Sequence, residues 1–229
     1  MTELADLTWP RVRDLAKAGA VLALPVGSTE QHGPHLPLST DTDIAVELCR
    51  RLALARKDVL VAPPLAYGSS GEHADFAGTL SIGQDAVELV LVELVRSAMR
   101  TFQRVLVVSA HGGNAEPATK ALRRLHAESR DVRMFTPNYG GDAHAGWSET
   151  AIQLAIRPMY VWMNRARPGD TRPLAELMPV LRTTGVRTVS PSGVLGDPTG
   201  ASADEGRVLL DLLTGQLMRE MDAWSPAMA

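Results

Sequence analysis

A dense group of carboxylate and imidazole side chains follows the first apolar segment of the chain. Within GSTEQHGPHLPLSTDTD, the residues that could bind a metal are Glu30, His32, His35 and Asp41. Carboxylate oxygens and imidazole nitrogens together suit zinc, iron(II) or manganese better than calcium or a metal that requires thiolates. Glu30 and His32 should point to the same side of an extended segment, since successive side chains alternate. The pattern predicts a metal site, in which Asp41 could bridge two ions.

The apolar segment itself predicts a buried strand that delivers this group. VLALPV, residues 21–26, is too short to span a membrane and too continuously apolar for a half-exposed strand. It therefore suits the centre of a parallel sheet, and open α/β sheets carry their sites at the carboxyl ends of such strands. In the alternative interpretation, Glu30 and Asp41 cap backbone amides of a loop and the histidines are incidental.

A second apolar strand is followed by another histidine. RVLVVSA, residues 104–110, leads directly into His111, Gly112 and Gly113. The carboxyl end of a parallel strand is a usual place for a ligand, and two glycines let backbone amides approach an anion or a carbonyl oxygen. The alternative for HGGN is a tight strand-to-helix turn, and Asn114 is expected to cap the helix that follows.

A long glycine-rich loop is predicted at residues 63–83, with at most a short strand at residues 79–82. Long loops in compact domains are often functional. Glu72 and His73 lie at its glycine-rich tip, where a solvated turn is the alternative interpretation.

Residues 138–146, NYGGDAHAG, form another glycine-rich segment, and it contains His144. Ser148 is expected to cap the next helix, which places Glu149 in the first helical turn. A carboxylate there also complements the helix dipole, so dipole complementation is the alternative explanation for Glu149.

The remaining pattern predicts an α/β fold with a mostly parallel central sheet. Apolar periodicity indicates helices near residues 9–18, 42–56, 84–102, 114–129, 148–156 and 201–224, and strands at residues 21–26, 58–62, 104–110 and 131–136. Residues 157–191 are rich in Arg and Pro and weakly periodic, which indicates a surface excursion or a subunit contact. Because the last helix belongs to the same fold, residues 1–229 are expected to form a single domain.

Composition narrows the class of protein. The formal net charge is -3 and only 4% of residues are aromatic, so neither nucleic acid nor an anionic membrane is an expected partner. Cys49 is the only cysteine, lies on the apolar side of its predicted helix, and agrees with a reducing cytoplasm. The first residues lack the apolar core of a signal peptide, and neither a phosphate-binding glycine signature nor a Gly-x-Ser-x-Gly elbow occurs.

Three motifs together resemble one family. GSTEQHGPHLPLSTD, HGGN and HAGWSET are similar to the creatininase family of binuclear metal amidohydrolases, over roughly residues 20 to 223. AYGSSGEHADFAGTLSIG and SGVLGDPTGASADEGR most resemble a peptidase branch of that family, which implies a modified precursor peptide as substrate. The resemblance also implies a three-layer αβα sandwich and a homo-oligomer, a hexamer built from dimers.

The resemblance assigns roles to residues of the site. Glu30, His32, Asp41 and His111 match metal ligands, and the aspartate bridges the two divalent ions, which would be zinc, iron(II) or manganese. Creatinine-hydrolysing members of the family carry an acidic ligand where this chain has Gly113. Glu149 is therefore our candidate for the missing carboxylate.

His144 matches the catalytic histidine of the family, and Glu149 is expected to share in catalysis. The long loop should lie over the substrate, and the residues expected to contact substrate are Tyr67, Glu72, His73, Gly112, Gly113 and Trp147. Metal-assisted amide hydrolysis follows, with His144 as proton donor to the leaving amine.

Several alternatives stay open at this point. Creatinine or a formylamide of a cofactor pathway is the alternative substrate. A metal-binding structural subunit without catalysis is an alternative of another class. A nucleotide-binding module is a further alternative, although GSTEQHGPH has too few glycines and too many acids for a phosphate-binding loop.

Overall fold

The structure is a computed structural model that describes residues 3–224. Its centre is a parallel sheet with the strand order β2-β1-β3-β4. The strands are β1 (Val21–Val26), β2 (Val59–Val61), β3 (Arg104–Ser109) and β4 (Val132–Phe135). β1 is buried along its whole length between β2 and β3, which confirms that its continuous apolar run marks a central strand.

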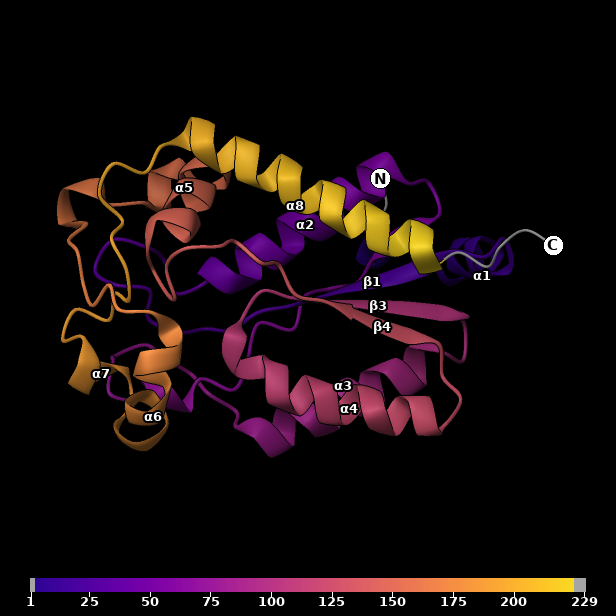
Figure 1. The fold of residues 1–229 in the computed structure, drawn as a ribbon. Helices are drawn as coiled ribbons and strands as arrows, with labels where there is room; N and C mark the ends of the chain where they lie inside the picture. Colours follow the sequence, from indigo (N-terminus) through magenta and orange to yellow (C-terminus); the bar gives the residue numbers. More distant parts are fainter. Residues whose placement is uncertain (1–2, 225–229) are drawn as a thin grey trace.

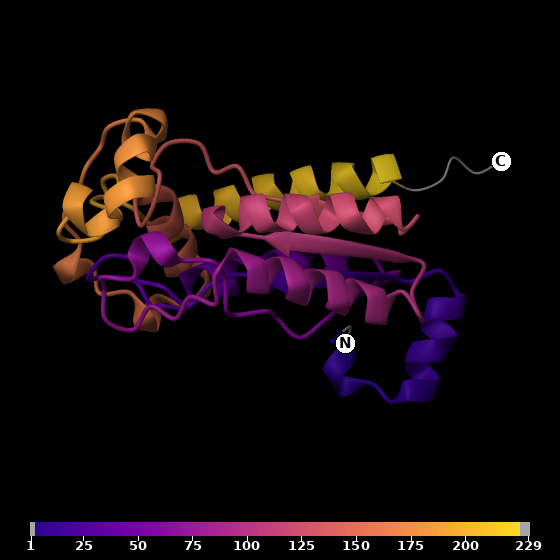
Figure 2. The same ribbon diagram turned by 90° about the horizontal axis from the view of Figure 1, so that it is seen from below.

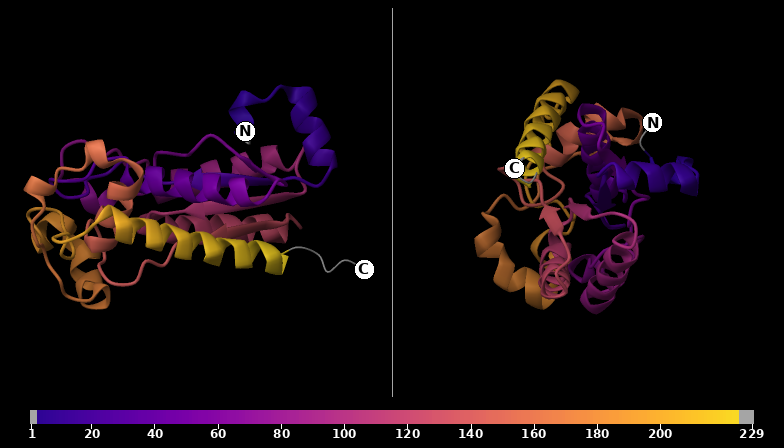
Figure 3. Two further views of the ribbon diagram at one scale, coloured as in Figure 1. Left: turned by 90° about the horizontal axis from the view of Figure 1, so that it is seen from above. Right: turned by 90° about the vertical axis from the view of Figure 1, so that its right-hand side faces the viewer.

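Helices cover both faces of this sheet (Figure 1). One face carries α2 (Thr40–Ala55), α5 (Trp147–Ile156) and α8 (Ala203–Trp224), and the other carries α3 (Gln84–Ala98) and α4 (Ala115–Ala127). The end-on view in Figure 3 shows the three layers, with α8 on one side of the strands and α3 and α4 on the other. The predicted three-layer αβα sandwich is therefore confirmed.

The remaining elements lie at the two ends of the sandwich (Figure 2). α1 (Trp9–Lys17) precedes β1 and follows the short 3-10 helix η1 (Leu4–Asp6), whereas α6 (Leu174–Thr184) and α7 (Val186–Val189) lie beyond the carboxyl ends of the strands. The other 3-10 helices are η2 (Gly71–His73), η3 (Gly112–Asn114), η4 (Pro158–Tyr160) and η5 (Met163–Arg165). None of the helices described between residues 3 and 224 is long and apolar enough to cross a membrane.

Residues 157–191 contain more regular structure than their weak periodicity indicates. α6 begins after Pro173 and includes Pro179, so prolines obscure the helical pattern. Leu177 and Leu181 of α6 and Val186 of α7 pack into a small separate core together with Leu195. A core this small needs few apolar positions, which is why the sequence shows little amphipathic signal here.

Asn114 is the N-cap residue of α4, as predicted, but neither Asn114 nor Ser148 makes the expected side-chain capping hydrogen bond. The side chain of Asn114 does not cap α4, because it binds Gly27 O and Ser69 N of two neighbouring loops. Ser148 is already inside α5, whose N-cap is Gly146, and its hydroxyl donates to Gly140 O. Both polar side chains connect loops of the site rather than capping the start of a helix.

No strand forms at residues 79–82 of the long loop. Leu80 N and Ile82 N each donate one isolated hydrogen bond there, to Thr29 O and Gly68 O.

The contact between α5 and α8 gives a test of the packing. A Cβ added to the buried Gly206 of α8 would lie 1.9 Å from Ala151 O of α5, whereas one added to Gly215 of α8 would meet nothing closer than 3.6 Å. Gly206→Ala should therefore lower the free energy of unfolding by about 1–3 kcal/mol, because the helices must move apart. Gly215→Ala is the matched control and should raise it by up to ~1 kcal/mol through helix propensity. Urea denaturation of both variants measures the difference, and equal effects would contradict this packing.

Candidate metal centre

The metal-binding side chains predicted from the sequence meet at the carboxyl ends of β1 and β3. Glu30 and His32 lie in the loop that leaves β1, and Asp41 is the second residue of α2, to which that loop leads. His111 lies two residues beyond the end of β3, and the intervening Ala110 donates to Val26 O of β1. All four side chains are buried.

The first group consists of Glu30, Asp41 and His111. Nδ1 of His111 lies 3.2 Å from Oε2 of Glu30 and 3.3 Å from Oδ2 of Asp41. The potential ligand atoms of these three residues all lie within 4.8 Å of one another. One nitrogen and two carboxylate oxygens therefore converge on one point.

The second group lies on the other side of Asp41. Nε2 of His32 is 3.2 Å from Oδ1 of Asp41 and 3.9 Å from Oε2 of Glu149, and His144 completes the group. Asp41 thus directs Oδ2 toward the first group and Oδ1 toward the second. This is the geometry of a carboxylate that bridges two positions.

In His32 and His111, the ring nitrogen that points away from the carboxylates faces a backbone carbonyl. Nδ1 of His32 lies 3.2 Å from Glu30 O, and Nε2 of His111 lies 2.9 Å from Ser69 O. A carbonyl oxygen only accepts hydrogen bonds, so each of these nitrogens carries the hydrogen. The inner nitrogens, Nε2 of His32 and Nδ1 of His111, are then the ones available to a metal, as in most metal-binding histidines.

Three carboxylate oxygens of Glu30 and Asp41 have no hydrogen-bond donor. Neither carboxylate oxygen of Glu30 nor Oδ2 of Asp41 accepts a hydrogen bond, although all three atoms are buried. Unpaired buried carboxylate oxygens are costly unless a cation compensates them. The donor set and these unpaired oxygens fit divalent ions with mixed nitrogen and oxygen ligands, such as zinc, iron(II) or manganese.

The electrostatics of the group favour positive charge. Burial alone would raise the pKa of Glu30, but nearby histidines, with His111 foremost, hold that pKa well below its usual value. Burial would lower the pKa of His32, yet the carboxylates, with Asp41 foremost, raise it to about 10. The pKa of His111 is also raised well above its usual value, by Glu30 and Asp41 against the effect of burial. The carboxylates therefore stabilise either protons on these histidines or bound cations.

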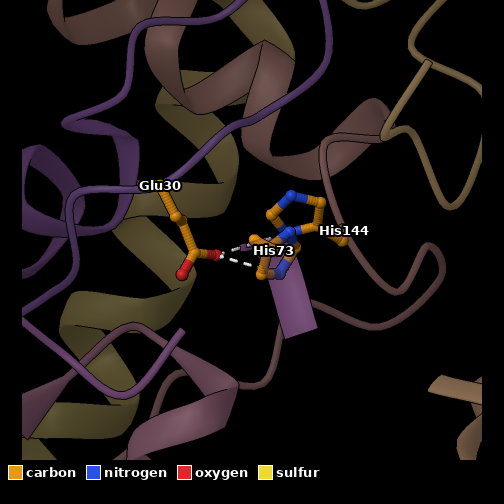
Figure 4. A group of neighbouring side chains, drawn as sticks. All are labelled: Glu30, His73 and His144. Atoms are coloured by element: carbon orange, nitrogen blue, oxygen red, sulfur yellow. Dashed lines mark ion pairs between the residues drawn. The ribbon is translucent and has the colours of Figure 1, made fainter. Parts of the chain in front are cut away.

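A third group brings two more histidines to Glu30 (Figure 4). Nε2 of His73 lies 3.4 Å and Nδ1 of His144 lies 3.8 Å from Oε1 of Glu30. The two imidazole rings pack side by side with centroids 4.5 Å apart. Burial lowers the pKa of His73 to about 4, and burial together with His32 and His73 lowers the pKa of His144 well below its usual value, which favours the neutral form of both rings.

The backbone of His144 is held by a segment far along the chain. His144 N donates to Leu195 O, and Leu195 N donates to His144 O at 2.9 Å, which forms an isolated antiparallel bridge. Asp142 reinforces the contact, since its Oδ2 accepts from Trp147 N and from Asp197 N. The catalytic histidine proposed from the sequence thus depends on the SGVLGDPTG segment for its position.

Glu149 reaches the site from the first turn of α5, as its sequence position indicates. Its Oε2 accepts a hydrogen bond from Ala145 N at 2.6 Å, and Ala145 has a φ of +53°, which is unfavourable for a side-chain-bearing residue. Burial raises the pKa of Glu149 to about 7, against the lowering effect of His32. Glu149 joins the His32 side of the centre, and its role as the carboxylate missing at Gly113 stays a prediction.

Gly113 is packed too tightly to carry any side chain. A Cβ there would lie 2.2 Å from Ser69 O, 2.5 Å from Nε2 of His111 and 2.8 Å from Oε1 of Glu72. The Glu72 carboxyl is partly buried beside this glycine, and its burial raises its pKa. The loop of residues 68–72 therefore fills the space that a ligand at position 113 would need.

The other residues expected at the site lie around its rim or behind it. Tyr67 is half exposed at 49%, and Gly112 has open space where a Cβ would be. Trp147 is partly buried and begins α5. His35 belongs to none of the three groups, because its Nε2 lies 2.9 Å from the Thr150 hydroxyl and thereby ties its loop to α5.

Sequence reasoning missed Gln31. Alternation along an extended segment would turn it away from Glu30 and His32, but the turn at Gly33 (φ +66°) brings its side chain against His73 and His144. Its position between two ligand residues was the one signal in the sequence. The loop-bridging role of Asn114 was hidden by its suitability as a helix cap.

Comparison with known proteins shows which family the chain belongs to. The family model for creatininase, described as creatinine amidohydrolase, matches residues 5–221. The mycofactocin precursor peptide peptidase of Mycobacterium ulcerans is 46% identical over 96% of this chain and 87% of that protein. The creatinine amidohydrolase of Pseudomonas putida is 29% identical over 91% of this chain and 92% of that protein. A solved structure of creatininase in a manganese form superposes with a TM-score of 0.85 at 23% identity, and covers 99% of both chains.

The fold and the side-chain groups at its strand ends are those of a metal-dependent amidohydrolase. The chain belongs to the creatininase family.

The bridging position of Asp41 predicts unequal losses of metal. Asp41→Ala should lose both ions, whereas Glu30→Ala should lose mainly one, because Glu30 contributes to the first group and not to the second. Asp43→Ala is the matched control, since this acid in the same helical turn instead pairs with Arg157 and should leave the metal content unchanged. Elemental analysis of the purified variants gives the ions per chain, and two ions retained in the Asp41 variant would contradict the bridging role.

The raised histidine pKa values predict that metal binding releases protons. His32 and His111 must become neutral at their inner nitrogens before they can bind a cation. Since the pKa of His32 is raised to about 10 and that of His111 is also raised, affinity for zinc should fall as the pH is lowered, by about tenfold per pH unit for each proton released. Calorimetry in buffers of different ionisation enthalpy counts the protons. His126→Gln, remote in α4, should leave the count unchanged, whereas an affinity independent of pH would exclude these histidines as ligands.

Proposed function

We propose that the protein is a binuclear metal-dependent peptidase that releases the C-terminal fragment derived from Val and Tyr from the mycofactocin precursor peptide. The observation that carries the proposal is the 46% identity to a mycofactocin precursor peptide peptidase over nearly the whole chain, against 29% to a creatinine amidohydrolase. Hydrolysis of creatinine or of a formylamide is the alternative for the same site.

The metal ligands in this proposal are Glu30, His32, Asp41, His111 and Glu149. Two divalent ions bound by the first and second groups would supply an activated water at neutral pH and would polarise the substrate carbonyl. Zinc, iron(II) and manganese all suit the donor set. The partly buried carboxyl of Glu72 stands beside Gly113 and His111, where it faces the same end of the site.

The protein residues then move the proton and exclude water. Nδ1 of His144 faces the Glu30 carboxylate, so it is placed to carry a proton to the leaving amide nitrogen as the carbon–nitrogen bond breaks. The oxygen of the water and its second hydrogen stay with the new carboxylic acid group. Burial of Glu30, His32 and Asp41 keeps bulk water from their charges and strengthens their interactions.

The rim of the site suits an extended peptide better than a small ring. Gly112 leaves open space beside His111, and Tyr67 presents a half-exposed ring at the start of the loop that passes over Gly113. An aromatic side chain at such a rim can pack against the tyrosine-derived end of a peptide. Trp147 at the start of α5 is the second aromatic residue that we assign to substrate binding.

We further propose a cytoplasmic homo-oligomer, a hexamer built from dimers. Residues 157–191 expose Met159, Tyr160 and Trp162 by 80%, 47% and 54%, and such a group of large apolar side chains is typical of a subunit contact. The lone buried Cys49, whose thiol pKa is raised by burial, agrees with a reducing compartment.

The substrate is tested directly by mass spectrometry. The metal-loaded protein, incubated with the decarboxylated and cyclised precursor peptide, should yield a shortened peptide and a small aromatic lactam. His144→Ala should keep both ions and lose about 10²- to 10⁴-fold in rate, the usual contribution of a general acid or base. An intact peptide together with rapid hydrolysis of creatinine or a formylamide would reject the peptidase and leave the family assignment unchanged.

A further inference from the structure

Gln31 lies between the two histidines, His73 and His144, that face Glu30. Its side chain is buried, and its Nε2 is 2.8 Å from Nδ1 of His73 and 3.1 Å from Gly193 O. Its Oε1 accepts a hydrogen bond from Gly33 N at 2.8 Å. Because a backbone N–H can only donate, this last contact fixes which end of the amide is oxygen and which is nitrogen.

The two hydrogens of the Gln31 amide are both used. One goes to Gly193 O, which can only accept, and the other goes to Nδ1 of His73. Nδ1 of His73 is therefore the bare nitrogen of that ring, and the neutral ring carries its hydrogen on Nε2. This Nε2 is the atom 3.4 Å from Oε1 of Glu30, within ion-pair range but outside hydrogen-bond alignment.

His144 turns its Nδ1 toward Glu30, whereas His73 turns its Nε2 toward the same carboxylate. Its Nε2 lies 2.8 Å from the backbone carbonyl of Gln31, which only accepts, so the hydrogen of the neutral ring is on Nε2. The Gln31 amide nitrogen at 3.1 Å has no hydrogen left for this atom. Nδ1 of His144, on the other edge of the ring, is bare and faces Oε1 of Glu30 at 3.8 Å.

We propose that Gln31 is a positioning residue that sets the two histidines to complementary tasks, with His73 presenting an N–H donor and His144 presenting a bare nitrogen to the same substrate space. The side chain of Gln31 fixes His73, and its backbone carbonyl fixes His144. The proposal rests on the proposed amide hydrolysis and assigns roles within it. Figure 4 shows both rings converging on the Glu30 carboxylate.

The assignment has a chemical consequence for each ring. Nδ1 of His144 accepts a proton from the attacking water while its oxygen bonds to the acyl carbon, and then gives that proton to the amide nitrogen as the carbon–nitrogen bond breaks. The Nε2–H of His73 donates to an amide oxygen of the substrate. His73 is therefore a substrate-binding donor, and Glu30, His73 and His144 do not form a third metal site, because a ligand nitrogen must be bare.

The experiment reads the hydrogen positions directly. In the zinc-loaded protein, which is diamagnetic, long-range proton–nitrogen correlation of labelled histidine distinguishes the two neutral forms of each ring. The chain has six histidines, so the signals lost in His73→Asn and His144→Asn assign both rings. We expect the Nε2–H form for both. A bare Nε2 on His73 or a bare Nε2 on His144 in the wild-type protein would overturn the proposal.

Gln31→Glu separates the two tasks. A carboxylate cannot donate to Nδ1 of His73, so a hydrogen should move onto that nitrogen, whereas His144 should keep its form because the backbone carbonyl is unchanged. The turnover number should fall by about 10- to 100-fold, the usual effect of losing a partner behind an active group, with a smaller change in KM. Gln103→Glu, an exposed position, is the matched control for charge and should change neither ring.

The outcomes are distinct from those of the substrate test. The nitrogen spectra need no peptide, so expected spectra with an uncleaved peptide would reject the peptidase and retain the hydrogen positions. Unchanged His73 spectra in a folded Gln31→Glu protein would reject the role of Gln31, whatever the peptide does.

Discussion

The compensation of two buried carboxylates is the constraint on which the site depends. Glu30 and Asp41 are removed from water and receive no hydrogen bond on three of their oxygens, so the surrounding chain must offer positive charge. His32 and His111 do so from the segments that follow β1 and β3, and their outer nitrogens are held by backbone carbonyls. The parallel pairing of these strands is what brings the four residues together, because their carboxyl ends open at one edge.

Much of this arrangement could be predicted from the sequence, because its signals are local. Each signal depends on a few neighbouring residues: the uninterrupted apolar run of β1, the histidine two residues beyond β3, and the periodicity of α2 and α8. These signals predict the three layers of the fold and the strand ends at which the site residues meet. The division of the ligands into two groups needed the structure, since it depends on which oxygen of Asp41 faces which histidine.

The parts that escaped prediction depend on contacts distant along the chain. Asn114 has the residue type of a helix cap, but Gly27 and Ser69 offer it better partners. α6 and α7 bury only a few side chains against Leu195, so their sequence lacks the long apolar stripe that would predict a helix. Gly113 shows the same limitation, since only the position of Ser69 O explains why that residue cannot bear a side chain.

The bridge between His144 and Leu195 also bears on how the protein is made. Gln31 meets Gly193 across 162 positions of sequence, and the backbone of His144 is paired only when residue 195 is in place. A ribosome must therefore complete most of the chain before the two histidines can take up their places, although the ligands from residues 30 to 111 can meet much earlier. The group of Glu30, Asp41 and His111 can thus form before His144 is in place, whereas the group on the His32 side must also wait for Glu149.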